Sequence, residues 1–218
     1  MNYTQLSSAI QAYAENTEAN FVAEIPVFVK QAEQRIYNTV QFPSLRKNVT
    51  GTTSANNKYL SCPGDFLATY SMAVIDGTGT YEYLLNKDVN FIRQAYPTPT
   101  ETGLPRYYAI FGPATANSDE LTFIMGPTPD AAYSVELHYY YYPESIVTAN
   151  TSWLGDNFDS VLLYGSLVEA YTYMKGEADI MQVYNTKYQE ALMLAKRLGD
   201  GMERQDAYRS GQYRQKVV

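Results

Sequence analysis

The two ends of the chain and its middle differ in the spacing of their apolar residues. In the first part, apolar side chains recur every three or four positions, the spacing that places them on one face of a helix. We therefore expect helices over residues 3–41, with Thr4 and Thr17 as N-terminal caps. A kink or restart is expected near Ile25-Pro26, because proline has no N–H to donate inside a helix.

The same spacing returns from Trp153 to Leu198 and predicts two amphipathic helices joined by a short turn. Gly176 is expected in the left-handed position that ends the first helix, since glycine adopts that conformation at little cost. Gly199 and Gly201 are expected to end the second helix, and no apolar periodicity follows them.

The middle of the chain alternates apolar and polar residues, which is typical of β-strands. Residues 67–75 and 81–85 flank an Asp-Gly-Thr-Gly turn and predict a β-hairpin. Residues 87–96 have helical spacing, with Asn86 as the expected cap. Further strands are expected at 106–111, 121–125 and 132–142, and the last of these contains a run of tyrosines.

These elements predict an α+β fold. The N-terminal and C-terminal helix pairs each need an apolar partner, so we expect them to pack together as a helical bundle. Several short strands with turns between them predict a small antiparallel β-sandwich or barrel inserted between the pairs. The expected domains are the N-terminal helices 1–45, the inserted β domain 46–150, the C-terminal helical hairpin 151–199 and an extended C-terminal arm 200–218.

Tyrosine content and charge distribution are the unusual features of the composition. The chain has 22 tyrosines against 8 phenylalanines, and tyrosine suits both strands and surfaces that become buried on assembly. Residues 196–218 carry six basic and three acidic side chains, or +3, which leaves −10 on the rest of a chain whose net charge is −7. An acidic body argues against a general nucleic-acid binder, whose affinity comes from neutralising phosphates.

The sequence offers few groups for catalysis or metal binding. Cys62 is the single cysteine, which excludes an internal disulfide, and we interpret it as a small apolar residue. His138 lies within an expected strand, where a structural role is favoured over that of a general base. Acidic residues gather at expected helix starts, where the helix dipole favours them: Asp156, Asp159, Glu177 and Asp179. We therefore expect no catalytic residue, no cofactor and no bound metal.

The N-terminal residues and the hydropathy of the chain indicate where the protein is made. The first six residues lack the basic and apolar regions of a secretion signal. No stretch approaches the ~20 apolar residues of a membrane span. We expect a protein made in a reducing cytoplasm, with no membrane contact.

The C-terminal arm repeats a tyrosine–arginine pair. Tyr208-Arg209 recurs five residues later as Tyr213-Arg214, and Arg204 precedes both. Tyrosine and arginine are enriched at binding hot spots, where each contributes ~2 kcal/mol or more when buried. An arm whose charge is opposite to that of its own body, attached to a rigid hairpin, is expected to dock on a partner.

Segments along nearly the whole chain resemble, in the same order, those of phage head-to-tail adaptor (connector) proteins. The N-terminal and central segments are Arg35-Ile36-Tyr37, Phe42-Pro43-Ser44-Leu45-Arg46-Lys47, Cys62-Pro63-Gly64-Asp65-Phe66, Gly103-Leu104-Pro105-Arg106-Tyr107-Tyr108 and Gly126-Pro127-Thr128-Pro129. The strongest similarity runs from Trp153 through Leu163-Tyr164-Gly165-Ser166-Leu167-Val168-Glu169-Ala170-Tyr171 to Leu198. Order and spacing carry the resemblance, because each segment alone is a turn or a packed helix face.

The resemblance implies a structural virion protein in the neck of a short-tailed phage. Such adaptors form a ring of twelve copies beneath the portal protein, and the ring joins the portal to the tail nozzle or tail fibres. Their C-terminal arms reach the portal, which places Arg204, Tyr208, Arg209, Tyr213 and Arg214 in a portal-binding arm. Genomic DNA passes through the channel of such a ring without specific binding, and assembly takes place in the host cytoplasm.

Tyrosine-rich patches suit the sides of a ring, because they tolerate water before assembly and pack on contact. Tyr139 and Tyr141 are our candidates for a ring or tail interface. A different hypothesis takes Tyr139 to Tyr142 as the stacking platform of a carbohydrate-binding or tail-fibre-associated module. A cell-wall hydrolase is a third hypothesis, but nothing in the sequence places two carboxylates around a cleft.

Overall fold

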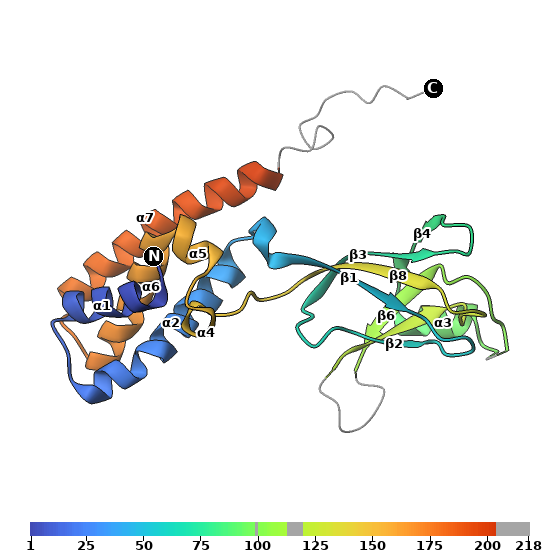
Figure 1. Ribbon diagram of the computed structural model, residues 1–218, viewed down its shortest axis with the longest axis horizontal. Helices are drawn as coiled ribbons and strands as arrows, with labels where there is room; N and C mark the ends of the chain where they lie inside the picture. Colours follow the sequence, from blue (N-terminus) through green and yellow to red (C-terminus); the bar gives the residue numbers. More distant parts are fainter. Residues whose placement is uncertain (99, 113–119, 204–218) are drawn as a thin grey trace. The chain divides into compact units, whose positions relative to one another are not determined.

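A computed structural model describes residues 1–98, 100–112 and 120–203 of the chain. The chain forms two compact units (Figure 1). A helical unit comprises Met1–Leu45 and the chain from Tyr142 onward, and a β unit comprises Arg46–Tyr141. The β unit is therefore inserted in the sequence of the helical unit. Helices and largely antiparallel sheets together confirm the α+β class.

The described part of the helical unit consists of four long helices and three short helical segments. The long helices are α1 (Tyr3–Ala14), α2 (Ala19–Thr39), α6 (Asp159–Met174) and α7 (Ala178–Glu203). The short segments are η1 (Pro43–Leu45), α4 (Ile146–Ala149) and α5 (Trp153–Asn157). Helix α6 packs against α1, α2 and α7 (Figure 1), so the N-terminal and C-terminal pairs form one bundle as expected. An ion pair between Arg35 of α2 and Glu169 of α6 adds to this packing.

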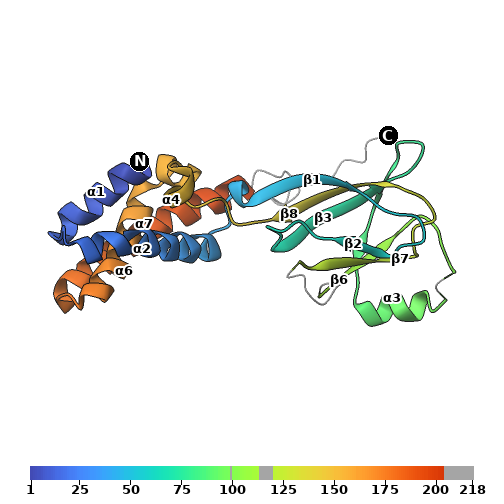
Figure 2. The same ribbon diagram turned by 60° about the horizontal axis from the view of Figure 1, so that its bottom comes forward.

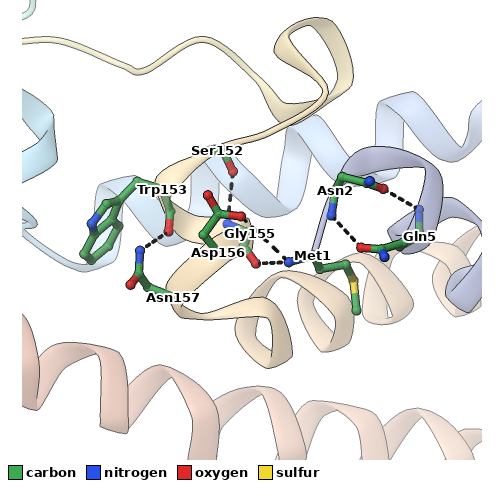
Figure 3. A network of polar contacts seen from close by, with 8 residues as sticks. All are labelled: Met1, Asn2, Gln5, Ser152, Trp153, Gly155, Asp156 and Asn157. Carbon is green, nitrogen blue, oxygen red and sulfur yellow. Dashed lines mark hydrogen bonds and ion pairs between the residues drawn. The ribbon is translucent and has the colours of Figure 1, made fainter.

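Helix α1 begins at a cap that the sequence prediction missed. Asn2, and not Thr4, is the cap: its side chain accepts a hydrogen bond from the Gln5 N–H at 2.9 Å. The Gln5 side chain in turn accepts from the Asn2 N–H at 3.0 Å (Figure 3). This reciprocal pair is a capping box in which asparagine and glutamine take the usual places of serine and glutamate.

Helix α2 also departs from the expected boundaries. Its N-cap position is Glu18, which makes no side-chain cap hydrogen bond, so Thr17 is not the cap. The helix runs through Pro26 instead of restarting there. An interior proline costs about 3 kcal/mol. Buried side chains on both sides of the proline, including Ile25 and Val29, hold the helix against the core and offset that cost.

Two glycines near the ends of α6 and α7 serve close packing instead of helix termination. Lys175, and not Gly176, has the left-handed backbone after α6, with φ of 53°. An added Cβ at Gly176 would lie 2.5 Å from Cδ1 of Tyr171. Helix α7 continues through Gly199 and Gly201 to Glu203, and an added Cβ at Gly199 would lie 2.9 Å from the Gln41 carbonyl oxygen. Helix α7 therefore passes close to the chain that follows α2.

The short helix α5 lies within the helical stretch predicted from Trp153, but the structure separates it from α6 at Phe158, and it joins the start of the chain to α6. The Ser152 hydroxyl accepts a hydrogen bond from the Gly155 N–H at 3.0 Å (Figure 3). The Met1 ammonium donates to the Gly155 carbonyl at 2.6 Å and lies 3.9 Å from the Asp156 carboxylate. A Cβ at position 155 would lie 2.5 Å from the Met1 carbonyl oxygen, so only glycine allows this approach.

The β unit contains two four-stranded sheets among its described residues. Sheet A has the order β1-β8-β3-β4 and sheet B the order β2-β7-β6-β5. All neighbouring strands are antiparallel except β5 with β6. The strands are β1 (Arg46–Thr52), β2 (Tyr59–Ser61), β3 (Ala68–Ile75), β4 (Tyr81–Tyr83), β5 (Leu85–Asn86), β6 (Tyr107–Phe111), β7 (Thr122–Gly126) and β8 (Ser134–Tyr140).

The inner faces of the two sheets pack on each other and enclose the core of the β unit. Sheet A contributes Met72, Val74, Val135, Leu137 and Tyr139, and sheet B contributes Tyr108, Phe123 and Met125. Helix α3 (Val89–Ala95) covers part of the outer face of sheet B, over β6 and β7 (Figure 2). Within the described β unit, no helix covers the outer face of sheet A.

Most of the β unit follows the predicted pattern. The hairpin of β3 and β4 and the strands β6, β7 and β8 are confirmed. Asp88, and not Asn86, caps α3, and its carboxylate accepts from the Asn90 N–H at 2.7 Å. Strands β1, β2 and β5 were missed, because two of them are very short and β1 is mostly polar and exposed.

A buried carboxylate fixes the chain where it re-enters the helical unit. Glu33 of α2 is 3% exposed and accepts a hydrogen bond from the Ile146 N–H at 2.9 Å, at the start of α4. The Ser145 side chain is a second partner. Burial raises the pKa of Glu33, and these hydrogen bonds oppose that rise. The buried N–H at the start of α4 requires an acceptor, and Glu33 of α2 supplies it.

We predict that Glu33→Ala lowers the free energy of unfolding by about 1–3 kcal/mol, because it leaves the buried Ile146 N–H without an acceptor. Glu33→Gln keeps an acceptor oxygen and should lose less. Since the folded protein holds the Glu33 proton more tightly, the native chain loses stability relative to Glu33→Gln as pH rises above about 4.3. Urea denaturation followed by circular dichroism measures both effects. Equal losses in the two variants would contradict the capping role.

Candidate assembly surfaces

Helix α7 carries two stripes of apolar residues, of which one is buried. The buried stripe consists of Tyr188, Ala191, Leu192, Ala195 and Gly199. Gly165 of α6 makes room for it: an added Cβ there would lie 3.2 Å from the Tyr188 ring and 3.3 Å from Cβ of Ala32 in α2. Three helices therefore meet at Gly165, and this contact sets which side of α7 faces the core.

Four tyrosines hold the first half of α7 in place. Tyr184 of α7 packs edge-on against Tyr171 of α6, with ring centroids 4.9 Å apart, and also contacts Tyr164 and Tyr13. The hydroxyls of Tyr171 and Tyr184 donate to the Tyr13 carbonyl at 3.3 and 3.4 Å, which satisfies a carbonyl in the last turn of α1. Burial and the bond with Tyr171 raise the pKa of Tyr184 to about 12. These tyrosines thus bind one another inside the helical unit.

The second stripe of α7, the outer stripe, faces away from that core. Its members are spaced three or four residues apart: Ile180, Val183, Lys187, Glu190, Leu194 and Leu198. Val183 is 55% exposed and Leu194 60% exposed, although both are large apolar side chains. Lys187 and Glu190 form an ion pair at 3.1 Å in the middle of the stripe. Apolar residues at heptad spacing, with a charged pair among them, are typical of a helix that packs against a second partner.

The outer face of sheet A is a second exposed aromatic surface. Tyr81 and Tyr83 stack with ring centroids 6.4 Å apart, and Tyr83 is 68% exposed. Tyr70 and Tyr140 pack edge-on at 5.9 Å, and the Arg46 guanidinium lies over both rings at 4.7 and 5.6 Å. We call these five residues the outer tyrosine face. Strand alternation and a bulge between Thr69 and Ser71 bring them to one side of the sheet.

Alternation separates the consecutive tyrosines 139–142. Tyr139 is 1% exposed in the core of the β unit, where its hydroxyl donates to the Asp65 carboxylate at 2.7 Å. Tyr141 is half-buried against the same core, and Tyr140 lies on the opposite face. Tyr142 belongs to the helical unit. The candidate interface residue Tyr139 therefore presents almost no ring surface to a partner, and the four rings share no common face.

The structure brings Ser71 and Glu136 to His138, a grouping that the sequence did not reveal. The Ser71 hydroxyl lies 3.1 Å from Nδ1 of His138, and the Glu136 carboxylate lies 3.3 Å from Nε2. All three project from the middle of sheet A, where β8 is hydrogen-bonded on both sides. The ladder thus occupies the backbone N–H groups that acyl transfer needs as oxyanion donors. The trio is a surface polar cluster.

The remaining candidate groups have structural roles. Burial raises the pKa of the Cys62 thiol to about 12, so the thiol stays protonated at neutral pH and acts as a small apolar residue. Asp156, Asp159 and Asp179 lie in the first turns of their helices, as expected for dipole stabilisation. The described residues contain no cluster of three potential metal ligands. None of the described helices is long and apolar enough to cross a membrane.

The five residues assigned to the portal-binding arm lie outside the described residues: Arg204, Tyr208, Arg209, Tyr213 and Arg214. Their role remains a prediction. The outer stripe of α7 was not predicted as a surface, because sequence spacing shows two apolar stripes without saying which one faces the core. The exposed fractions of Leu192 and Leu194, 5% and 60%, make that distinction.

We predict opposite stability effects at these two neighbouring leucines. Leu192→Ala removes a buried side chain and should cost about 2–5 kcal/mol. Leu194→Ala removes an exposed one and should change the unfolding free energy by no more than ~0.5 kcal/mol in dilute protein that sediments as a monomer. Urea titration of the two variants tests this. A large loss for Leu194→Ala under those conditions would mean that the outer stripe belongs to the monomer core.

A family of known proteins matches nearly the whole chain, including all of α7. The family model described as "SU10 adaptor protein" matches residues 1–215. A search of curated proteins finds no match. Because the family model spans both units, the match rests on the inserted β unit as well as on the helical bundle. The chain belongs to the SU10 adaptor protein family.

Proposed function

We propose that this chain is a structural virion protein that joins the portal of a short-tailed phage head to the tail, as a ring of twelve copies around the DNA exit channel. Family membership supports a phage adaptor, a structural class of protein. The observation that carries the proposal is the outer stripe of α7, which exposes Val183, Leu194 and Leu198 on a helix already fixed by its other side. An exposed apolar stripe of this kind is typical of a contact surface.

The charged residues of the helical unit favour a second copy of the chain as the partner that covers the outer stripe of α7. Near the end of the outer stripe, Lys196 and Arg197 have no carboxylate partner among the described ion pairs. The turn between α1 and α2 and the start of α2 carry Glu15, Glu18 and Glu24, which are also unpaired there. The basic end of one copy therefore complements the acidic start of α2 in the next. A contact between two different surfaces repeats around a rotation axis, and this builds a ring.

We predict that Leu194→Glu abolishes self-association, because it places a charge in the middle of an apolar contact. Met193→Glu is the matched control: Met193 is 57% exposed on the same helix but lies about 100° away around its axis. Sedimentation velocity of both variants, alone and with portal rings, measures the assembly state. If Met193→Glu disrupts assembly as strongly as Leu194→Glu, the outer stripe is not the interface.

The C-terminal arm supplies the contact with the portal in this proposal. Two Tyr-Arg pairs within seven residues give each copy a short set of hot-spot side chains. Twelve such contacts, each weak alone, act together when the ring and the portal share their symmetry axis. An arm that binds only an assembled portal also delays neck formation until the head is ready.

We predict that Arg209→Ala combined with Arg214→Ala weakens binding to the portal at least tenfold and leaves thermal stability unchanged. The combination Lys87→Ala with Arg106→Ala removes the same charge from exposed positions of the β unit, outside the proposed ring contact, and serves as the control for net charge. Surface plasmon resonance on immobilised portal rings compares the three proteins. Equal binding by the arm variant and the native chain would remove the arm from the mechanism.

The outer tyrosine face favours one alternative, a carbohydrate-binding or tail-fibre-associated module. Exposed stacked rings such as Tyr81 and Tyr83 are suited to pack against sugar faces. This alternative explains the aromatic residues of sheet A but gives no role to the outer stripe of α7. Titration with host surface glycans separates the two. Saturable binding that is lost in Tyr83→Ala would favour the module.

A further inference from the structure

A pocket lies on the outer face of sheet B, beside α3. Helix α3 lies over β6 and β7 (Figure 2) and packs against Ala109 and Ile124, and the pocket extends from there to Tyr59 of β2. Tyr59 of β2 pairs with Ile124 of β7 across the sheet, so both residues belong to this outer face. Between them, the last turn of α3 and the turn at Asn56 lies a cavity of about 270 Å³.

Both walls of the pocket are held in place. On one side, an added Cβ at Gly126 would lie 2.9 Å from Ile92 and 3.0 Å from the Tyr96 ring, so α3 sits directly on the backbone of β7. On the other side, Asn56 has a left-handed backbone with φ of 61°, and its N–H donates to the Pro129 carbonyl at 2.8 Å. The Lys58 carbonyl accepts from the Met125 N–H at 2.8 Å. A pocket with fixed walls is a preformed binding site and not a transient gap.

The charged side chains that line the pocket are both cationic. Lys58 and Arg93 line it from opposite walls, and none of its described lining residues is acidic. Neither cation has a carboxylate within ion-pair distance among the described residues. Two such cations around one cavity are unusual in a chain with 23 acidic and 16 basic side chains. The charge of the site therefore complements an anion.

The rest of the lining selects the kind of anion. Ile92, Ile124, Tyr96 and Pro97 provide apolar and aromatic walls for a side chain. A volume near the lower limit of ligand sites fits one aromatic or large aliphatic group with its carboxylate.

We propose that this pocket binds an apolar carboxylate presented by a partner protein, with the carboxylate between Lys58 and Arg93 and the side chain against Ile92 and Ile124. The occupant is a C-terminal aromatic or aliphatic residue of that partner, because its carboxylate and its side chain leave the same Cα and fit together in a cavity of this size. The site belongs to the β unit, so it is independent of the outer stripe of α7 and of the C-terminal arm.

The test is a titration of the full-length chain with three small probes, followed by the methyl resonances of Ile92 and Ile124. N-acetylphenylalanine mimics a C-terminus, and N-acetyl-aspartyl-phenylalaninamide mimics an internal acidic segment. N-acetylphenylalaninamide is the neutral control. We expect saturable shifts at both methyl groups with N-acetylphenylalanine, and at least tenfold weaker binding of the neutral probe. Tighter binding of the aspartyl probe than of N-acetylphenylalanine would contradict a C-terminal occupant.

Variants then assign the anion contact. Lys58→Gln and Arg93→Gln should each weaken the binding of N-acetylphenylalanine several-fold. Lys87→Gln changes a lysine outside the lining and should leave this binding unchanged. Equal binding of neutral and acidic probes would overturn the proposal, as would an equal loss in Lys87→Gln. Tighter binding of inorganic phosphate than of either acidic probe would also overturn it, and so would the absence of shifts with all probes.

Discussion

The close approach of α2, α6 and α7 at Gly165 determines what the helical unit can present to a partner. An added Cβ at that point on α6 would lie 3.2 Å from the Tyr188 ring and 3.3 Å from the Ala32 methyl group, so glycine lets the three helices pack there without a shift of either neighbour. Tyr188 then lies in the core with 2% of its surface exposed, and the buried stripe of α7 follows it along the helix. The outer stripe lies about 100° away around the axis, where it cannot reach the same core. Its exposure is thus a consequence of how the core is packed.

This arrangement connects stability with assembly. The tyrosine cluster and the Glu33 cap fix the helices without using the outer stripe, so the helical unit is complete before a neighbour arrives. The charged pair Lys187 and Glu190 interrupts the apolar residues of the stripe and keeps it compatible with water. The β unit has its own core, and it presents an aromatic face on sheet A and a cationic pocket on sheet B. A protein that contacts several partners one after another benefits from surfaces that do not depend on one another.

Sequence patterns predicted the long helices and the strands β3, β4, β6, β7 and β8, because their apolar residues repeat over several turns or pairs. Strand β1 is as long as β8 but was missed, because it is mostly polar and exposed. The patterns also failed where a single contact decides the outcome. Gly176 and Gly199 were assigned to helix ends, but each is set by a neighbouring group, the Tyr171 ring and the Gln41 carbonyl, that no local pattern contains. Tyr139 and Tyr141 were assigned to an interface from composition, whereas alternation turns Tyr139 into the core. The outer stripe and the pocket beside α3 require knowledge of which elements are adjacent, and only the fold supplies it.

The central claim is that the chain closes into a ring on the portal, and the mass of that complex tests it most directly. Full-length protein is added in excess to the portal ring of its phage, and the complex is weighed by native mass spectrometry. The account predicts one portal ring carrying twelve copies of the chain, with no substantial population of intermediate stoichiometry at saturation. A complex with no added copies, or with a variable number that never closes at twelve, would contradict it.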